Sequence, residues 1–561
     1  MNKMLKLSIL STIIISMVLV GNLSTMAAPN SQIPSNLTYT GCINTNPKGA
    51  IYNVAVGNNS TSPCNKGDIQ TSFVDKSYIN SLDARLSAIE NVLANVSSSG
   101  NDIYFNNTNV HITSGSGSTD GPVNGLGNLI IGYNEKRGSG DDRTGSHNLI
   151  LGQENNYKSY AGVIAGSNGE ISGAYSTVNG GFNNIASGQY SSVSGGDNNK
   201  ARGNYSVVSG GISNGAGGEV SSVSGGENNR ATGDHSSVSG GKNNVASGIA
   251  SSVTGGDDAS AIGNVSSVTG GNDNRAKGDY SSIGGGISNV AGGPYSSATG
   301  GQNNIASGTA SSATGGISNT ASGSVSSVTG GENNTASYVG DSVNGGGNNN
   351  ANGGKSSVTG GISNIASGPY SSVTGGAYSL ANGGESSVTG GIFNTAFQFY
   401  SSATGGYSNT AKGFYSSVTG GSSNTASGDN SSVTGGFNGM ATNFADSVTG
   451  GSGNLASGGD SSVTGGSLNI ASGLFSSVTG GSGNLASGID SSVTGGFVNK
   501  AGGADSSVTG GSENKADTFS SSSVSGGFNN TASGPHSSIS GGANIVASND
   551  SCWQGDGFGN C

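Results

Sequence analysis

A single pattern of fifteen residues recurs about twenty-five times along most of this chain. It reads S-S-V-T-G-G-x-x-N-x-A-S-G-x-x, and its copies fill residues 176–548. Position 6 of the pattern is Gly and position 11 is Ala in every copy, position 3 is usually Val, and position 9 is Asn in all but four copies. A fixed period of this size is typical of repeat architectures, in which each copy is one structural unit.

The alternation of apolar and polar residues predicts two short strands in each copy. S-S-V-T alternates over a β-branched run, and N-x-A-S alternates around the invariant Ala. The Gly residues at positions 5, 6 and 13 predict turns, and they exclude a helix because each costs about 1 kcal/mol relative to Ala. We therefore predict an all-β fold, a parallel β-solenoid or β-roll of about 15-residue coils stacked roughly 4.8 Å apart.

The inward positions of such a coil would be Val at 3 and Ala at 11. Asn at position 9 predicts a ladder of side-chain amides that bonds coil to coil, which begins with Asn184, Asn199, Asn214, Asn229 and Asn244. Two small apolar residues per coil hardly offset about 1 kcal/mol or more of backbone ordering per residue. We therefore expect a lone solenoid to be marginally stable and the protein to be an oligomer.

Residues 75–97 are the one stretch with helical periodicity. Its apolar residues step by three and four, as at the a and d positions of a coiled coil: Ile79, Leu82, Leu86, Ile89, Leu93 and Val96. Arg85 falls at g and Glu90 at e, the spacing of an interchain salt bridge in a parallel assembly. The run from Arg85 to Glu90 also resembles the R-h-x-x-h-E pattern of three-stranded coiled coils. We predict a short parallel trimer, with a helix packed on its own chain as the alternative.

The flanking segments predict an exported protein with capped ends. Residues 1–27 read as a secretory signal, with an apolar run too short for a membrane span. Residues 28–72 would form a small disulfide-containing module, residues 101–175 an N-terminal cap of degenerate coils, and residues 549–561 a C-terminal disulfide cap.

Four cysteines in an exported chain predict disulfides. Three connectivities are open, of which Cys42–Cys64 with Cys552–Cys561 is the simplest. Metal ligation is the competing interpretation, but no two cysteines have a CxxC spacing and no His lies near them in the sequence.

Composition and charge argue against several functions. A net charge of −11 disfavours nucleic-acid binding, which requires basic patches. The four His are scattered, and the Gly-rich turns lack the G-K-[ST] of a phosphate-binding loop. We therefore expect no enzymatic activity, no cofactor, no metal, no nucleic-acid partner and no membrane span.

Position 15 is often aromatic and is a candidate for surface contact. The tyrosines concerned are Tyr190, Tyr205, Tyr280, Tyr295, Tyr370, Tyr400 and Tyr415. Aligned along a solenoid, they would form a stripe suited to glycan or surface contact. They would equally serve as apolar filler at a corner or between protomers.

The repeat resembles the head repeats of trimeric autotransporter adhesins of the YadA type, which follow S-V-A-x-G-x-x-[SN]-x-A-x-G. The similarity covers residues 161–548 and implies a parallel β-roll in a trimer, in agreement with the coiled-coil pattern. In those adhesins the stalk follows the head, whereas here the helix precedes the repeats. The sequence also ends without the alternating strands of a β-barrel anchor. The resemblance therefore implies the architecture and not the autotransporter mechanism.

These observations together predict a secreted, non-enzymatic, adhesin-like trimeric fibre, extracellular or cell-surface associated. Its partners would be its own copies and a host or neighbouring cell surface, matrix or glycan. A purely structural or tail-fibre-like rod is the second hypothesis. The third is an ice-binding solenoid, because Ser at position 2 and Thr at position 4 would stack into hydroxyl ladders on one face.

Overall fold

The computed structural model describes residues 38–43, 51–56, 63–66, 69–74 and 76–555. The predicted signal peptide, residues 1–27, lies outside them. The chain divides into two units, Met1–His111 and Ile112–Cys561. Within the described ranges, no helix is both long and apolar enough to cross a membrane.

The first unit contains a three-stranded antiparallel sheet. Strand β1 (Thr38–Ile43) lies between β2 (Ile51–Val56) and β3 (Ile69–Val74) and pairs with both. The predicted Cys42–Cys64 disulfide is confirmed, and Cys42 is fully buried. Closing a loop of this length stabilises the fold by about 3 kcal/mol in the chain-entropy model.

Helix α2 (Lys76–Val92) is shorter than the predicted coiled-coil segment. Leu93 lies in the turn after the helix, and Val96 begins β4 (Val96–Ser99). Strand β4 pairs antiparallel with β5 (Asp102–Phe105) through a turn in which Gly100 has a φ of 59°. The helix therefore ends five residues before the predicted segment does, because residues 93–95 form a turn and the chain then enters the hairpin.

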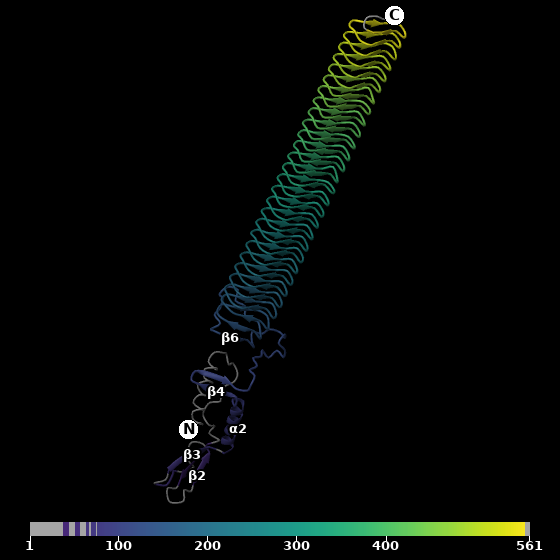
Figure 1. The fold of residues 1–561 in the computed structure, drawn as a ribbon. Coiled ribbons are helices and arrows are strands. Elements are labelled where there is room, and N and C mark those ends of the chain that lie inside the picture. The colour runs from purple at the N-terminus through teal and green to yellow at the C-terminus, as the bar shows by residue number, and fades with distance from the viewer. Residues whose placement is uncertain (1–37, 44–50, 57–62, 67–68, 75, 556–561) are drawn as a thin grey trace. The chain divides into compact units, whose positions relative to one another are not determined.

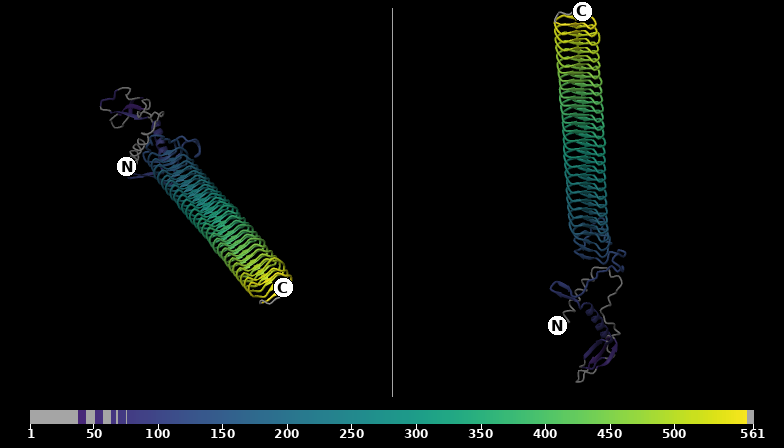
Figure 2. Two further views of the ribbon diagram at one scale, coloured as in Figure 1. Left: turned by 90° about the horizontal axis from the view of Figure 1, so that it is seen from above. Right: turned by 45° about the vertical axis from the view of Figure 1, so that its right-hand side comes forward.

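In the second unit each fifteen-residue copy forms one coil, and the coils stack into a straight rod (Figures 1 and 2). Positions 2 and 3 form one series of strands, which includes β13 (Ser192–Val193) and β15 (Val207–Val208). Positions 10 and 11 form the other series, which includes β14 (Lys200–Ala201) and β16 (Gly215–Ala216). Each strand pairs in parallel with its counterpart in the next coil. The predicted all-β parallel solenoid with coils of about fifteen residues is confirmed.

The two strand series extend along the whole repeat region. The first passes from β11 (Thr177–Val178) to β59 (Ser538–Ile539), and the second from β12 (Ile185–Ala186) to β60 (Val546–Ala547). One extra residue near Ser521 does not break the stack, because Ser507 still pairs with Ser523. With roughly 4.8 Å per coil, the 25 copies form a rod about 120 Å long.

The core lies between the two sheets and is made of small side chains. In the copy at 191–205, Val193, Asn199 and Ala201 are fully buried, and Ser191 is 1% exposed. Val and Ala occupy the core as predicted. The buried Ser at position 1 and Asn at position 9 add polar atoms to it. The variable positions 7, 8, 10, 14 and 15 lie outside this core.

Backbone hydrogen bonds connect neighbouring coils in both directions. At most ladder positions the N–H donates to the next coil, as Ser192 does to the carbonyl of Ser206 at 2.9 Å. At positions 8 and 15 it donates to the preceding coil, as Tyr205 does to Gln189 at 2.8 Å. Tyr205 has a φ of 57°, a left-handed conformation that costs a non-glycine residue about 1–2 kcal/mol. Each coil therefore has two corners whose backbone conformation the side-chain pattern does not predict.

The first coils of the rod have larger side chains in their strands than the later coils do. Strand β6 (Leu129–Ile131) pairs in register with β7 (Leu149–Leu151), which in turn pairs with β9 (Val163–Ile164). The loop between β6 and β7 is held by two arginines that are less than one-fifth exposed. Arg137 donates to carbonyls of the next coils, and Arg143 donates to carbonyls within the loop.

This loop also covers β8 (Asn156–Tyr157), the first strand of the second series. The N–H of Tyr157 donates to the carbonyl of Asp142 at 3.1 Å, and the N–H of Gly145 donates to the carbonyl of Tyr157 at 2.8 Å. The side which another coil would occupy is therefore bonded to the protein's own loop.

Candidate binding surface

The asparagine column at position 9 is buried and connects the coils. Asn199 Nδ2 donates to the carbonyl of Gly195 in its own coil at 2.9 Å and to that of Gly211 in the next coil at 2.8 Å. Asn199 Oδ1 accepts the N–H of Asn214 at 2.9 Å. The bonds therefore join amides to the backbone rather than to one another. The same set recurs at Asn184, Asn214 and Asn229, and Asn244 donates in the same way.

Two buried carboxylates escaped the sequence analysis. Asp341 and Asp446 replace Ser at position 1 and are fully buried. Asp446 accepts the N–H and the hydroxyl of Ser461 at 3.0 and 2.7 Å, and the N–H of Asn443 at 2.7 Å. Asp341 makes corresponding bonds. In both places the preceding coil lacks the usual Gly at position 13, which is a signal the sequence contained. Both carboxylates therefore have a structural role, since their hydrogen-bond partners are backbone N–H groups and a serine hydroxyl of the same chain.

The tyrosine column at position 15 lies on the surface. Its seven predicted members are 43 to 62% exposed. Neighbouring rings stack with centroids 5.0 Å apart for Tyr190 and Tyr205 and 4.8 Å apart for Tyr400 and Tyr415. Tyr280 and Tyr295 stack in the same way. Because the stacked faces cover one another, these rings present their edges and hydroxyls outward, and a sugar ring could stack face-on only at the end of each run.

Charged residues interrupt this column and bond to its tyrosines. Lys355 Nζ donates to the hydroxyl of Tyr370 at 3.0 Å and lies 5.0 Å from the ring centroid. The hydroxyl of Tyr400 donates to Glu385 at 3.2 Å. The hydrogen bond to Tyr370 raises the pKa of Lys355, and the charge of Glu385 raises the pKa of Tyr400. At neutral pH the lysine is therefore charged and the phenol is neutral.

One outer sheet face is an uncharged array of hydroxyls. Position 2 is Ser in nearly every copy, and position 4 is Thr or Ser in most. Both side chains reach solvent, while Val at position 3 points into the core. From β35 (Ser357–Thr359) to β49 (Ser462–Thr464) this strand series includes position 4, so that Thr359 aligns with Thr374.

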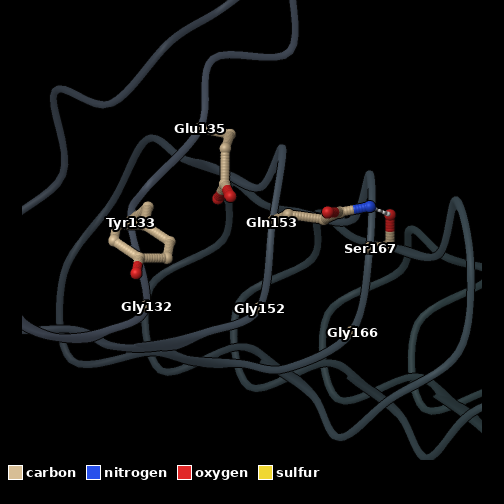
Figure 3. Close-up of a pocket in the computed structure, with 7 residues that line it drawn as sticks. All are labelled: Gly132, Tyr133, Glu135, Gly152, Gln153, Gly166 and Ser167. Carbon is tan, nitrogen blue, oxygen red and sulfur yellow. Dashed lines mark hydrogen bonds between the residues drawn. The ribbon is translucent and has the colours of Figure 1, made fainter.

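A solvent-open hollow of about 360 Å³ lies on the capping coils (Figure 3). Gly132, Gly152 and Gly166 line it in one column, and Tyr133 and Glu135 stand at its rim. Glu135 is the single carboxylate in this lining, whereas general acid–base hydrolysis uses a pair. The lining of this hollow therefore does not contain the carboxylate pair that such hydrolysis uses.

The remaining reactive groups are the possible metal ligands and the cysteine near the C-terminus. The described ranges contain no group of three or more His, Cys, Asp or Glu that could hold a metal ion. Cys552 is disulfide-bonded, and its predicted partner, Cys561, lies outside the described residues.

The apolar seam of α2 is exposed in the single chain. Leu82 is 39% and Ile89 is 40% exposed, and Leu93, in the turn after the helix, is 36% exposed. Leu86 is partly buried, and Arg85 and Glu90 are exposed. Ile79 also lies in α2. The described chain therefore does not cover this face.

No protein-family model matches the chain, and no curated protein matches it.

Proposed function

We propose that this protein is a secreted, non-enzymatic, adhesin-like fibre that contacts a cell surface, matrix or glycan along its rod. One observation carries the proposal, namely the division of each coil into constant and variable positions. The constant positions 3, 6, 9 and 11 form the core and its bonds, whereas the variable positions 7, 8, 10, 14 and 15 lie outside the core. A rod of this kind repeats its backbone while it varies its surface, which suits recognition of an extended partner.

The proposed fibre is a trimer joined through α2. Its exposed apolar seam supports this assembly, because a helix with an uncovered apolar stripe gains stability when a partner helix covers it. Arg85 and Glu90 are both exposed and therefore accessible to a neighbouring chain. A helix of 17 residues is marginal as an isolated coiled coil, so the solenoid would help to hold the trimer together.

Light scattering on the full chain tests the trimer, with three chain masses as the expected result. The double variant Leu82→Asp/Ile89→Asp is expected to give a single chain mass, because it places two carboxylates in an apolar interface where they have no partners. The matched control Ser81→Asp/Ser87→Asp adds the same charge at exposed polar sites of α2 and should remain trimeric. A parent protein with a single chain mass would contradict the trimer.

Surface contact is tested separately with the labelled full chain on immobilised cells, matrix and glycans. Retention on at least one surface is expected, and the monomeric variant should be retained about 10²-fold less well because it loses avidity. The absence of retention on every surface would contradict the contact function, whatever the oligomeric state.

The uncharged hydroxyl face favours a second candidate, ice binding. Its Ser and Thr columns repeat with the coil spacing of about 4.8 Å over the length of the rod. Thermal hysteresis of the parent chain that is lost in Thr419→Lys, on this face, but kept in Ser427→Lys, on the opposite sheet, would support it. A parent chain without hysteresis at high concentration excludes this function.

A further inference from the structure

A hollow of about 490 Å³ lies on the outer face of the second strand series, near the N-terminal end of the rod. Two glycines create it. Gly215 and Gly217 stand at positions 10 and 12 of their coil, where most copies have larger side chains. A Cβ added to Gly215 would meet no atom within 4 Å, and one added to Gly217 would make only ordinary contacts. The backbone conformation therefore does not require glycine at either position. The two glycines instead leave open space on the outer face of the sheet.

Cationic side chains surround these glycines. In the sheet register Gly215 lies between Lys200 and Arg230. Arg202 stands beside Lys200 on the same coil and also lines the hollow. Within the described residues none of the three cations forms a salt bridge, although Lys242, Arg275 and Lys500 elsewhere on the rod do. These three cations are therefore not held in ion pairs by the described part of the chain.

The hollow lies on a sheet face whose charged residues in this part of the rod are all basic. Positions 10 and 12 between residues 185 and 277 contain five basic residues and no acidic one: Lys200, Arg202, Arg230, Arg275 and Lys277. Between residues 290 and 487 the same positions contain a single charge, Lys412. The net charge of the whole chain is −11, so this concentration of positive charge runs against its composition.

Neutral donors line the rim beside the cations. Asn198, Ser213 and Asn228 stand at position 8 of successive coils and border the hollow. The floor offers few donors, because the N–H groups of Gly215 and Gly217 bond to the next coil at 2.8 and 2.7 Å. Side chains are therefore the groups that would bind a ligand here, with cations for its anionic groups and amides and a hydroxyl for its hydroxyls.

We propose that this hollow binds an acidic polysaccharide through its sulfate or carboxylate groups. This rests on the proposed contact function, because it names the ligand class for one part of that surface. The open shape suits a polymer that crosses the sheet, and the volume lies within the ~300–1,000 Å³ of small-ligand sites. Nucleic acid fits less well, because no aromatic side chain lines the hollow for base stacking.

The test measures binding of the full chain to immobilised dextran sulfate, polygalacturonate, neutral dextran and duplex DNA. Binding to dextran sulfate or polygalacturonate is expected, and comparison of the two separates sulfate from carboxylate recognition. Lys200→Gln/Arg230→Gln should weaken binding at least about tenfold, since each removes a charged hydrogen-bond donor. Lys412→Gln/Lys515→Gln removes the same charge from the same face further along the rod, and it should change binding less than about twofold.

Gly215→Ile separates shape from charge, because it fills the hollow and retains all three cations. Ile occupies position 10 in other coils, as at Ile305, so this variant is expected to fold and to bind at least about tenfold more weakly. Equal weakening by the two double variants, equal binding to neutral dextran, or tighter binding to DNA would overturn the proposal. Failure to bind either acidic polysaccharide would do the same, yet retention of the fibre on cells or matrix would leave the contact function intact.

Discussion

Substitution of Gly241 by Ala is expected to destabilise the rod by about 3 kcal/mol or more. Gly241 stands at position 6 with a φ of +86°, a conformation that costs Ala about 1–2 kcal/mol. Its new Cβ would also collide with the carbonyl oxygen of Gly256 and with Asn244 Nδ2. Relief of the clash requires the coils to separate or the asparagine bond to break, which leaves buried polar groups unpaired at about 1–3 kcal/mol each.

The adjacent Gly240 provides the matched control. An added Cβ there meets no atom within 4 Å, and its φ lies outside the left-handed region. Gly240→Ala is therefore expected to leave stability within about 1 kcal/mol of the parent, with a gain where the unfolded chain loses freedom. Urea denaturation checks both variants. Equal midpoints would show that the invariance of position 6 has a cause other than the conformation and the close approach of the next coil.

Ala259→Asn is expected to stabilise the rod by about 1–3 kcal/mol, because it repairs a gap in the asparagine column. Ala259 replaces Asn at position 9, is fully buried, and accepts no bond from its neighbour through its side chain. Its own N–H still bonds to Asn244 Oδ1 at 2.9 Å. The N–H of Asn274 in the next coil lacks the side-chain acceptor that its counterparts have. An asparagine at 259 would supply this acceptor and two donors.

Hydrogen exchange at the Asn274 amide is the sharpest measurement of this repair, and its protection factor should rise together with the urea midpoint. Ala259→Leu is the matched control, since it adds a side chain of similar size without hydrogen-bonding groups. We expect it to lower stability by about 1–3 kcal/mol through overpacking. If the Asn and Leu variants shift the midpoint equally, the hydrogen bonds of the column contribute nothing measurable to stability.

The fifteen-residue period and the alternation of apolar and polar residues made the strands of each coil predictable. The backbone conformation at the corners of the coil was not predictable from the sequence. Val193 and Ala201 could be assigned to the core because each recurs once per coil in an alternating run. The left-handed conformation of Tyr205 could not, because a tyrosine carries no preference for it. Its cause is the hydrogen bond to the preceding coil, which exists only once the coils are stacked.

Side chains whose partners come from other coils were the least predictable. Asn199 could be predicted as a ladder member, but its acceptors are turn carbonyls whose direction is set by glycine geometry. Gly215 was visible in the sequence as a departure from the pattern, although only the register places it between two cations. The end of α2 at Val92 was missed because the heptad spacing continues beyond it, whereas the hairpin after it takes Val96 into a strand.

The loop between β6 and β7 limits how further strands can add to this stack. Parallel strands stacked at a spacing of about 4.8 Å are also the geometry of amyloid fibrils, which grow as new chains add to their ends. At the start of the second strand series, the groups that would accept a newcomer already bond to Asp142 and Gly145. A further strand therefore cannot add to the second series at this end, because the chain's own loop occupies its place. In this respect the second strand series differs from a fibril, whose end strands stay free to bind new chains.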